Sequence, residues 1–180
     1  NRILQDIDSY IMTRPDSALT VLEGMSRDVL RTERQRAHHA LLHAMALDKN
    51  YIDVSEDSIA SVAVNYYSRK GPMKYRARAY YYLGLAYYYQ QDYDRAILEF
   101  TKAEKTAEVS DSLYLGMTKS IQGHSYYETH NLEEVLNCFH KAYDIYSALS
   151  EYSKACSVMY KLISTYIAKL EFEKAEEMLL

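Results

Sequence analysis

Glycine, proline, cysteine and tryptophan are scarce in this 180-residue sequence, which contains 5, 2, 2 and 0 of them. So few turn-forming residues disfavour a β-fold with many tight turns and favour long helices. Two cysteines without a C-x-x-C pair exclude a disulfide scaffold and give no zinc or redox motif. The longest apolar stretch, residues 79–89, is too short to cross a bilayer, so we expect no membrane segment.

Catalytic and nucleic-acid-binding signals are also missing. Lys and Arg number 21 against 25 Asp and Glu, which gives a formal net charge of −4 and no basic surplus for nucleic acid. The sequence lacks G-x-x-x-x-G-K-[ST], G-x-G-x-x-G, H-E-x-x-H and G-x-S-x-G, the motifs of nucleotide binding, zinc proteolysis and serine hydrolysis. We therefore expect a protein that is not an enzyme, has no cofactor or metal and makes no direct contact with nucleic acid.

What is present is an apolar fraction of 48%, sufficient for a core, and an excess of tyrosine. Twenty tyrosines stand against three phenylalanines. A phenol combines rigid apolar area with a hydrogen-bonding tip, which suits either a packed core or a binding surface.

A repeated pattern organises the second half of the chain. The first copy reads Tyr80-x-x-Leu83-Gly84-x-x-Tyr87, then Asp92-Tyr93, Ala96, Phe100 and Ala103. The second reads Gly123-x-x-Tyr126, then Asn131-Leu132, Val135, Phe139 and Ala142, and the third reads Leu162-Ile163-x-x-Tyr166, then Glu171-Phe172, Ala175 and Leu179. The copies are 39 and 40 residues apart. Each shows two helical apolar periods around a polar joint, which predicts a helix hairpin that must stack on its neighbours.

The same helical pattern extends along the whole chain. Met73 to Gln90 is expected to form one helix, and Asp92 to cap the next. Upstream, the expected helices are Ile3 to Met12, a helix from Pro15 that stops at Gly24, Arg31 to Asp48, and Glu56 to Tyr67 after a loop at Asn50 to Ser55. We therefore expect about ten helices in five hairpins.

The repeated residues resemble the tetratricopeptide repeat (TPR) family. The resemblance implies an all-α fold, an α-solenoid of about five stacked antiparallel hairpins in a right-handed superhelix. We expect one array over residues 1–180, with clear repeats at 77–180 and weaker hairpins at 1–70. The sequence departs from the family where Lys119 and Gln122 replace apolar residues, where Ile163 replaces glycine, in the missing closing proline, and in a spacing longer than the usual length of about 34.

A looser resemblance connects the first residues with bacterial TPR regulators and TPR lipoproteins. It rests on Ile7 to Tyr10, on Arg14-Pro15-Asp16-Ser17-Ala18-Leu19, on Asp48-Lys49-Asn50 and on Tyr66-Tyr67. It implies an extracytoplasmic, periplasmic sensor array tethered to a membrane and joined to a DNA-binding segment. Because the sequence starts at Asn1 and stops at Leu180 inside an apolar helical pattern, we expect a fragment of a longer protein.

TPR geometry also implies a concave groove lined by the first helix of each hairpin. Tyr80, Tyr87 and Tyr126 occupy packing positions. The expected groove residues, with Glu128 beside them, are Arg78, Tyr81, Leu85, Tyr88, Tyr89, Met117, Ser120, His124, Tyr127, Tyr160, Ser164 and Ile167. The competing interpretation is an exposed helix face that tolerates scattered tyrosines without any function.

These residues lead to two hypotheses about function. The first is a protein- or peptide-binding scaffold that holds a partner segment in the groove. The places of the family's Lys and Asn clamp for C-terminal carboxylates hold other residues here, so a chaperone-tail adaptor is not expected: Leu41, Met45, Tyr81, Leu85, Ser120 and His124. The second is a structural assembly module that self-associates through its terminal helices, motivated by Leu179 and Leu180. The sequence leaves the oligomeric state open.

Three further groups of residues, the histidines, the cysteines and a basic run, are candidates for a metal site, a disulfide and a binding surface. His39 and His43, next to His38, could ligate a metal on one helical face, but no third ligand stands beside them, which favours surface histidines. Cys138 and Cys156 are expected about 9 Å apart along an antiparallel pair, too far for a bridge, and therefore free and buried. The basic run of Arg69, Lys70, Lys74, Arg76 and Arg78 is either a solvated loop, an anchor for an acidic partner, or a surface for stacked bases.

Overall fold

The computed structural model describes residues 2–53, 57–107 and 111–179, and within these ranges it contains helices and no strand. The α-helices are α1 (Arg2–Tyr10), α2 (Pro15–Glu23), α3 (Glu33–Lys49), α4 (Asp57–Tyr67), α5 (Met73–Tyr89), α6 (Tyr93–Ala107), α7 (Ser112–Glu128), α8 (Leu132–Ala148), α9 (Tyr152–Ala168) and α10 (Phe172–Glu177), with a short 3₁₀ helix, η1 (Arg27–Val29). The predicted all-α fold is confirmed, while Val54 and Ser55, expected in the loop, and Glu56, expected to start the next helix, lie outside the described residues. No helix in the described ranges is long and apolar enough to cross a bilayer.

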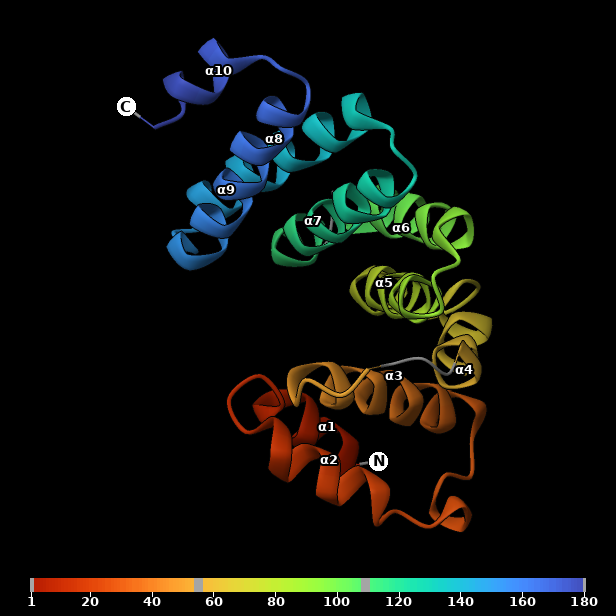
Figure 1. The fold of residues 1–180 in the computed structure, drawn as a ribbon. Helices are drawn as coiled ribbons and strands as arrows, with labels where there is room; N and C mark the ends of the chain where they lie inside the picture. Colours follow the sequence, from red (N-terminus) through yellow and green to blue (C-terminus); the bar gives the residue numbers. More distant parts are fainter. Residues whose placement is uncertain (1, 54–56, 108–110, 180) are drawn as a thin grey trace.

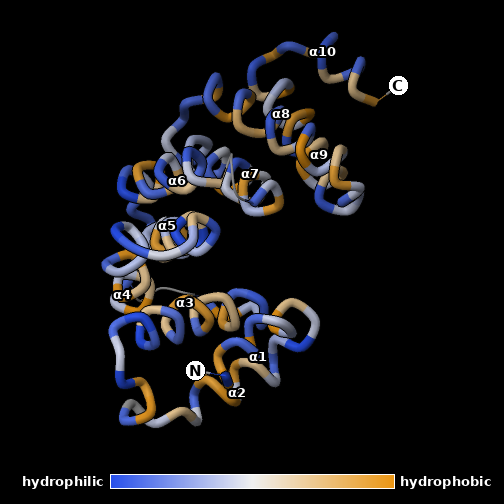
Figure 2. Tube along the Cα trace, turned by 180° about the vertical axis from the view of Figure 1, so that it is seen from behind, coloured by the Kyte–Doolittle hydropathy of each residue, from blue (hydrophilic) through white to orange (hydrophobic). Residues whose placement is uncertain are grey.

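Consecutive helices pair into hairpins that stack in one curved row (Figure 1). The first helices of the hairpins also contact one another, α1 with α3, α3 with α5 and α5 with α7, and form the inner row of the stack. The two termini lie at opposite ends of the row. This arrangement is the expected α-solenoid, in which each hairpin buries a face against its neighbours. Every helix carries both hydrophilic and hydrophobic stretches, as an amphipathic helix in such a stack must (Figure 2).

Polar side chains cap the starts of α6 and α3, and a glycine follows the end of α2. The Asp92 carboxylate accepts a hydrogen bond from the Arg95 amide at 3.1 Å at the start of α6, which confirms the predicted cap. Thr32 and Gln35 form a reciprocal capping box at the start of α3. Gly24 follows the last residue of α2 as expected, in the right-handed conformation, with φ of −73°.

The turns inside the hairpins repeat one backbone geometry. Tyr51, Gln91, His130 and Leu170 all have φ between 57° and 61°, the left-handed region, at spacings that match the sequence repeat. After each of them, the next amide donates to a carbonyl in the last turn of the preceding helix; for Asp92 and Tyr87 the distance is 2.9 Å. This is the closing motif that usually contains glycine. Here it is built from residues that adopt a positive φ at a cost.

Two glycines allow the helices of a hairpin to approach closely. A Cβ atom added to Gly84 would lie 2.7 Å from the Phe100 ring, and one added to Gly123 would lie 2.7 Å from the Phe139 ring. Both contacts are too short for real side chains, so the ring packs directly against the backbone of the facing helix. The two hairpins α5–α6 and α7–α8 are therefore built on the same small-against-large pairing.

The buried apolar side chains form two clusters instead of one. The first extends from Leu4 to Tyr114 and the second from Val135 to Ala175. Between these clusters α7 buries several polar side chains, which are Thr118, Lys119, Gln122 and Ser125. The core is thus interrupted where the sequence departs from the TPR pattern.

We call the polar contacts between the two clusters the polar seam, formed by Thr101, Glu104, Lys119, Gln122 and Cys138. The Lys119 ammonium lies 2.5 Å from Glu104 Oε1 and donates to Gln122 Oε1 at 3.2 Å. Gln122 Nε2 donates to Thr101 Oγ1 at 3.2 Å, and the Cys138 thiol donates to Gln122 Oε1 at 3.6 Å. Lys119 and Gln122 are therefore compatible with burial because they satisfy each other and their neighbours.

Replacing Gln91 by glycine should stabilise the protein. Glycine removes the steric cost of the left-handed conformation and adds a smaller backbone entropy cost, so we expect a gain of about 0.5–1 kcal/mol in the free energy of unfolding. Urea denaturation followed by circular dichroism measures it. The matched control is Gln90→Gly, at φ of −78°, which should lose stability. Equal losses in both variants would contradict the turn geometry.

Removing the cation of the polar seam should destabilise the protein. Lys119→Met leaves the Glu104 carboxylate, whose side chain is only 16% exposed, without its close partner, and should cost about 2–4 kcal/mol. The double variant Lys119→Met, Glu104→Met should recover most of this loss, because no uncompensated charge is left. Lys154→Met, which breaks the exposed pair with Glu151, is the control and should cost less than about 1 kcal/mol. If Lys119→Met alone lost as little stability as this control, the coupling between Lys119 and Glu104 would be refuted.

Candidate functional site

The inner helices carry the expected groove at equivalent positions of the repeat. Leu41, Tyr81, Ser120 and Tyr160 correspond to one another at spacings of 39 or 40 residues. Leu41 is fully buried and Tyr81 is 6% exposed, whereas Tyr160 is 67% exposed. The difference arises because α5 covers α3 and α7 covers α5, while no further inner helix follows α9 in the described chain.

Two of the expected groove residues belong to the core. The Tyr81 ring lies edge-on to Tyr82 and Tyr114, with centroids at 5.0 and 5.4 Å, and burial raises its pKa well above the ordinary value. Leu85 is 3% exposed and belongs to the same apolar cluster. The expectation that these two side chains line an open groove is wrong, because the packing of α5 against its neighbours encloses them.

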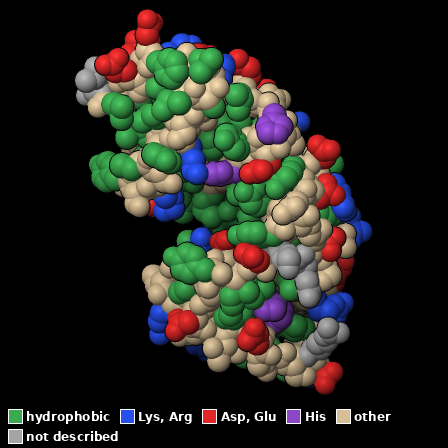
Figure 3. Space-filling view, in the orientation of Figure 1, with side chains coloured by type: hydrophobic (Ala, Val, Ile, Leu, Met, Phe, Trp, Pro, Cys, Tyr) green, Lys and Arg blue, Asp and Glu red, His purple; other side chains and the backbone are tan. Residues whose placement is uncertain are grey.

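Other expected residues remain accessible on the inner helices. Tyr89, Tyr127, Tyr160 and Ile167 are exposed, and the half-buried members are Tyr88, Met117, Ser120, His124 and Ser164. Figure 3 shows this face hollowed between the part built from α7 and α9 and the part built from α1 and α3. Hydrophobic side chains lie in the hollow, and a basic, a histidine and an acidic side chain follow one another along its rim. These accessible residues are the candidate groove.

Burial and neighbouring charges shift the pKa values of titratable groups in the candidate groove. The His124 ring lies edge-on to Phe139 at 5.3 Å, and burial, with the Lys161 ammonium as a smaller cause, lowers its pKa. Burial, and next the Glu128 carboxylate, raises the pKa of Tyr88. At neutral pH the groove therefore offers an uncharged imidazole and protonated phenols as hydrogen-bonding groups. Lys161 was not among the expected residues, since its approach to His124 depends on how α9 packs.

Arg78 is occupied by partners inside the protein. Its Nε and Nη2 atoms donate to Asp111 Oδ2 at 3.0 and 2.8 Å, and its guanidinium lies 4.7 Å from the centre of the Tyr114 ring. Asp8 of α1 lies 4.0 Å away and accepts a hydrogen bond from the Tyr75 hydroxyl at 2.6 Å. Arg78 thus links α1, α5 and the start of α7, and its expected role in the groove is corrected to a structural one.

Two cations of the basic run cap a helix. Arg69 donates through Nε and Nη2 to the Asn65 carbonyl at 2.9 and 2.7 Å, and Arg76 Nε donates to the Tyr67 carbonyl at 2.8 Å. Both carbonyls lie at the end of α4, where the helix dipole favours positive charge. The contacts support neither a simple solvated loop nor an anchor for an acidic partner at these two positions.

His38 and His39 each pair with a different group, and the two cysteines differ in exposure. His38 Nδ1 pairs with the Tyr67 hydroxyl at 3.1 Å and His39 Nε2 with the Leu22 carbonyl at 3.0 Å. Among the described residues, no group of three or more His, Cys, Asp or Glu side chains could hold a metal. Both thiols are free; Cys138 is buried, which raises its pKa to about 11, but Cys156 is exposed, so its expected burial is wrong.

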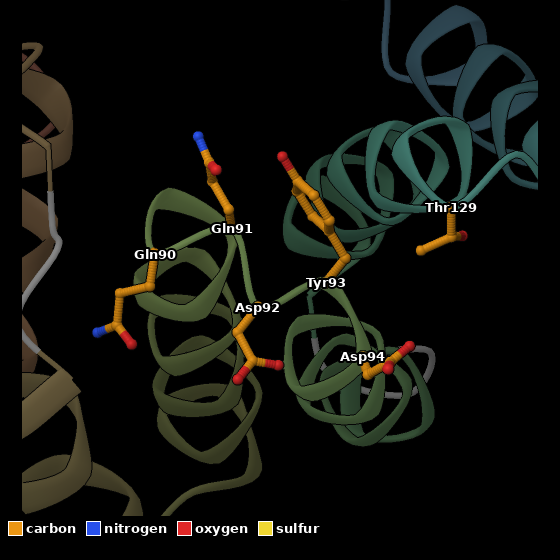
Figure 4. Close-up of a pocket in the computed structure, with 6 residues that line it drawn as sticks. All are labelled: Gln90, Gln91, Asp92, Tyr93, Asp94 and Thr129. Carbon is orange, nitrogen blue, oxygen red and sulfur yellow. The ribbon is translucent and has the colours of Figure 1, made fainter.

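A polar notch of about 380 Å³ lies outside the candidate groove, beside the turn between α5 and α6 (Figure 4). Its lining residues are Gln90, Gln91, Asp92, Tyr93, Asp94 and Thr129. The Asp92 carboxylate accepts a hydrogen bond from Arg95 Nε at 2.5 Å, which lowers the pKa of Asp92. Its main acidic group is therefore engaged in capping α6.

Comparison with known proteins agrees with this geometry. The tetratricopeptide repeat family matches residues 77–108, which lie in α5, α6 and the residue after them. The search of curated proteins gives no match. Nearly identical TPR-like repeats of a Podosopora anserina protein, described as a kinesin light chain, have a TM-score of 0.68 at 15% identity and cover 98% of this chain and 89% of that one. BtubC (BKLC) from P. vanneervenii has a TM-score of 0.70 at 16% identity, covering 96% of this chain and 70% of that one.

At such identities the two structures support the fold alone. The matched repeat at 77–108 supplies the sequence evidence, and the stack of equivalent hairpins extends the same geometry through the described residues. Residues 77–108 are therefore similar to the tetratricopeptide repeat family, and the described hairpins share its all-α stacked fold.

Proposed function

We propose that this chain binds a segment of another protein in its candidate groove. TPR scaffolds generally serve protein interactions, and the proposal is carried by one observation. On α5 and α7, each of which is followed by a further inner helix, Tyr89 and Tyr127 stay 39% and 49% exposed. Tyr160 and Ile167 of α9 add 67% and 48% exposed side chains. Apolar side chains of this size on a concave face suit a partner chain.

The chemistry of the groove favours a mixed apolar and polar ligand. The tyrosines offer flat apolar area with hydroxyl tips, and Ser120, His124 and Ser164 add groups that can pair with a peptide backbone. The charges near the groove are of both signs, with Lys161 close to His124 and Glu128 close to Tyr88. We therefore propose an extended or helical segment that places apolar side chains against the tyrosines and is neither strongly acidic nor strongly basic.

We further propose that this single array is the sensor or interaction region of a longer bacterial TPR regulator on the periplasmic side of a membrane. The support is the sequence resemblance at Ile7 to Tyr10 and Arg14 to Leu19. In this view partner binding in the groove would bias a signalling output elsewhere in the protein. The reading frame that encodes the chain tests this, since flanking sequence without an anchor or a DNA-binding segment would contradict it.

Truncating the exposed groove tyrosines should weaken peptide binding without unfolding the protein. Peptides enriched from a random phage-displayed library on the wild-type chain should bind Tyr127→Ala and Tyr160→Ala at least about tenfold more weakly. Both side chains are half exposed or more, so urea denaturation should show little change in stability. Tyr51→Ala, at a 97% exposed tyrosine outside the groove, is the matched control. The proposal fails if peptides bind all three variants as they bind the wild type.

A second candidate function is self-assembly through the last hairpin. Its specific support is a run of exposed apolar side chains at the end of the stack, where Leu170 is 74%, Phe172 59% and Leu179 69% exposed. Leu180, part of the original motivation, lies outside the described residues. Such a surface on and around α10 would suit a second copy of the chain better than a groove ligand.

A negative charge at the C-terminal end of the stack should prevent self-assembly. We expect a mass above that of the monomer by light scattering at high protein concentration, and a return to monomer in Phe172→Glu. Asp94→Glu, at an exposed position away from this end, is the control and should keep the wild-type mass. A monomeric wild-type chain at all concentrations would refute self-assembly and leave peptide binding unaffected.

A further inference from the structure

The first two hairpins border a cavity, open to solvent on one side, that none of the groove residues lines. It measures about 720 Å³ and lies where α2, α3, α4 and the segment after α2 meet. Its lining residues are Leu22, Glu23, Met25, Leu30, Arg36, His39, Ala40, His43, Ser58, Ile59 and Val62. The volume falls in the range of small-molecule sites, about 300–1,000 Å³.

The lining has the composition of a site for an apolar molecule. Five large apolar side chains and Ala40 line it together with five polar or charged residues, Glu23, Arg36, His39, His43 and Ser58. Two further cavities, of about 380 and 390 Å³, are lined mainly by polar side chains. A mostly apolar wall with a few polar groups is typical of ligand pockets, where apolar contacts give affinity and polar contacts give orientation.

One polar atom of a lining side chain is left without a partner. His43 Nε2 is buried and makes no hydrogen bond within the part of the chain that the structure describes. Its neighbours are engaged, since His39 Nε2 pairs with the Leu22 carbonyl at 3.0 Å and Arg36 Nη1 donates to the Leu30 carbonyl at 3.2 Å. Burying an unpaired nitrogen costs free energy that a ligand atom in the cavity would recover.

The surroundings of His43 define the kind of group that fits. Burial lowers the pKa of His43, and His39 adds to this, so the ring is neutral at pH 7, with one nitrogen that donates and one that accepts. A hydroxyl can donate or accept, so it pairs with Nε2 in either tautomer. Glu23 and Arg36, of opposite charge, both line the cavity, so its lining carries no net charge that would favour an ionic ligand. A metal has no third ligand of His, Cys, Asp or Glu among the described residues.

We propose that this cavity binds a small neutral amphiphile, an apolar body that carries one hydroxyl, with the hydroxyl hydrogen-bonded to His43 Nε2. The apolar body packs against Leu22, Ile59 and Val62, which come from two different hairpins. The site is separate from the candidate groove and does not depend on peptide binding there. Because its walls come from α2, α3 and α4, an occupant joins the first two hairpins.

The test uses 1-octanol as the probe and the whole 180-residue chain. Methyl resonances of Ile59 and Val62 and the ring resonances of His43 should shift saturably in NMR titrations. His43→Leu should bind 1-octanol about threefold to tenfold more weakly, the loss expected for one hydrogen bond. Octanoate, with the same chain and a carboxylate, should bind at least about fivefold more weakly than 1-octanol to the wild type.

A matched pair of variants separates the cavity from a general surface effect. Val62→Trp fills the cavity and should abolish the shifts, whereas Val21→Trp, at a valine of similar exposure that does not line the cavity, should leave them unchanged. Shifts that never saturate, or that persist in Val62→Trp, would overturn the site. Unchanged affinity in His43→Leu, or octanoate binding as tight as that of 1-octanol, would overturn the proposed hydroxyl recognition.

Discussion

The close approach of paired helices is the constraint on which the rest of this structure depends. Gly84 and Gly123 leave no room for a side chain, and the rings of Phe100 and Phe139 fill the space against the facing backbone. Each hairpin still has an apolar face to cover, so it needs the next hairpin for its stability. Curvature, the concave face and the gaps between hairpins all follow from how these units stack.

Tyrosine serves this architecture in both of its roles. Inside the stack, the hydroxyls of Tyr82 and Tyr114 lie 3.0 Å apart, and Tyr82 also reaches towards Asp48 at 3.5 Å, so the phenol tips are satisfied among polar groups. On α7 and α9 the same residue type is exposed at Tyr127 and Tyr160. A tyrosine at equivalent positions of the repeat can therefore be buried or exposed, because its burial depends on whether a neighbouring helix covers it.

The polar seam separates the two apolar clusters at α7. Its Lys119–Glu104 pair and the hydrogen bonds of Gln122 with Thr101 and Cys138 connect α6, α7 and α8. The candidate groove draws on α5, α7 and α9, and the amphiphile cavity lies in the first two hairpins. The two proposed binding regions thus draw on different parts of the stack.

The spacing of small and large apolar residues was enough to predict the helices, their pairing and the stacked all-α fold, because that periodicity is local and repeats. The αL turns at Gln91 and His130 escaped prediction, since neither is the glycine that usually marks them. Exposure was decided by tertiary structure alone. Tyr81 and Tyr160 are equivalent in sequence, yet only Tyr81 is covered by a following inner helix. Arg78 was drawn away from the groove by Asp8 and Asp111, which lie far from it in the chain and meet it only when the hairpins stack.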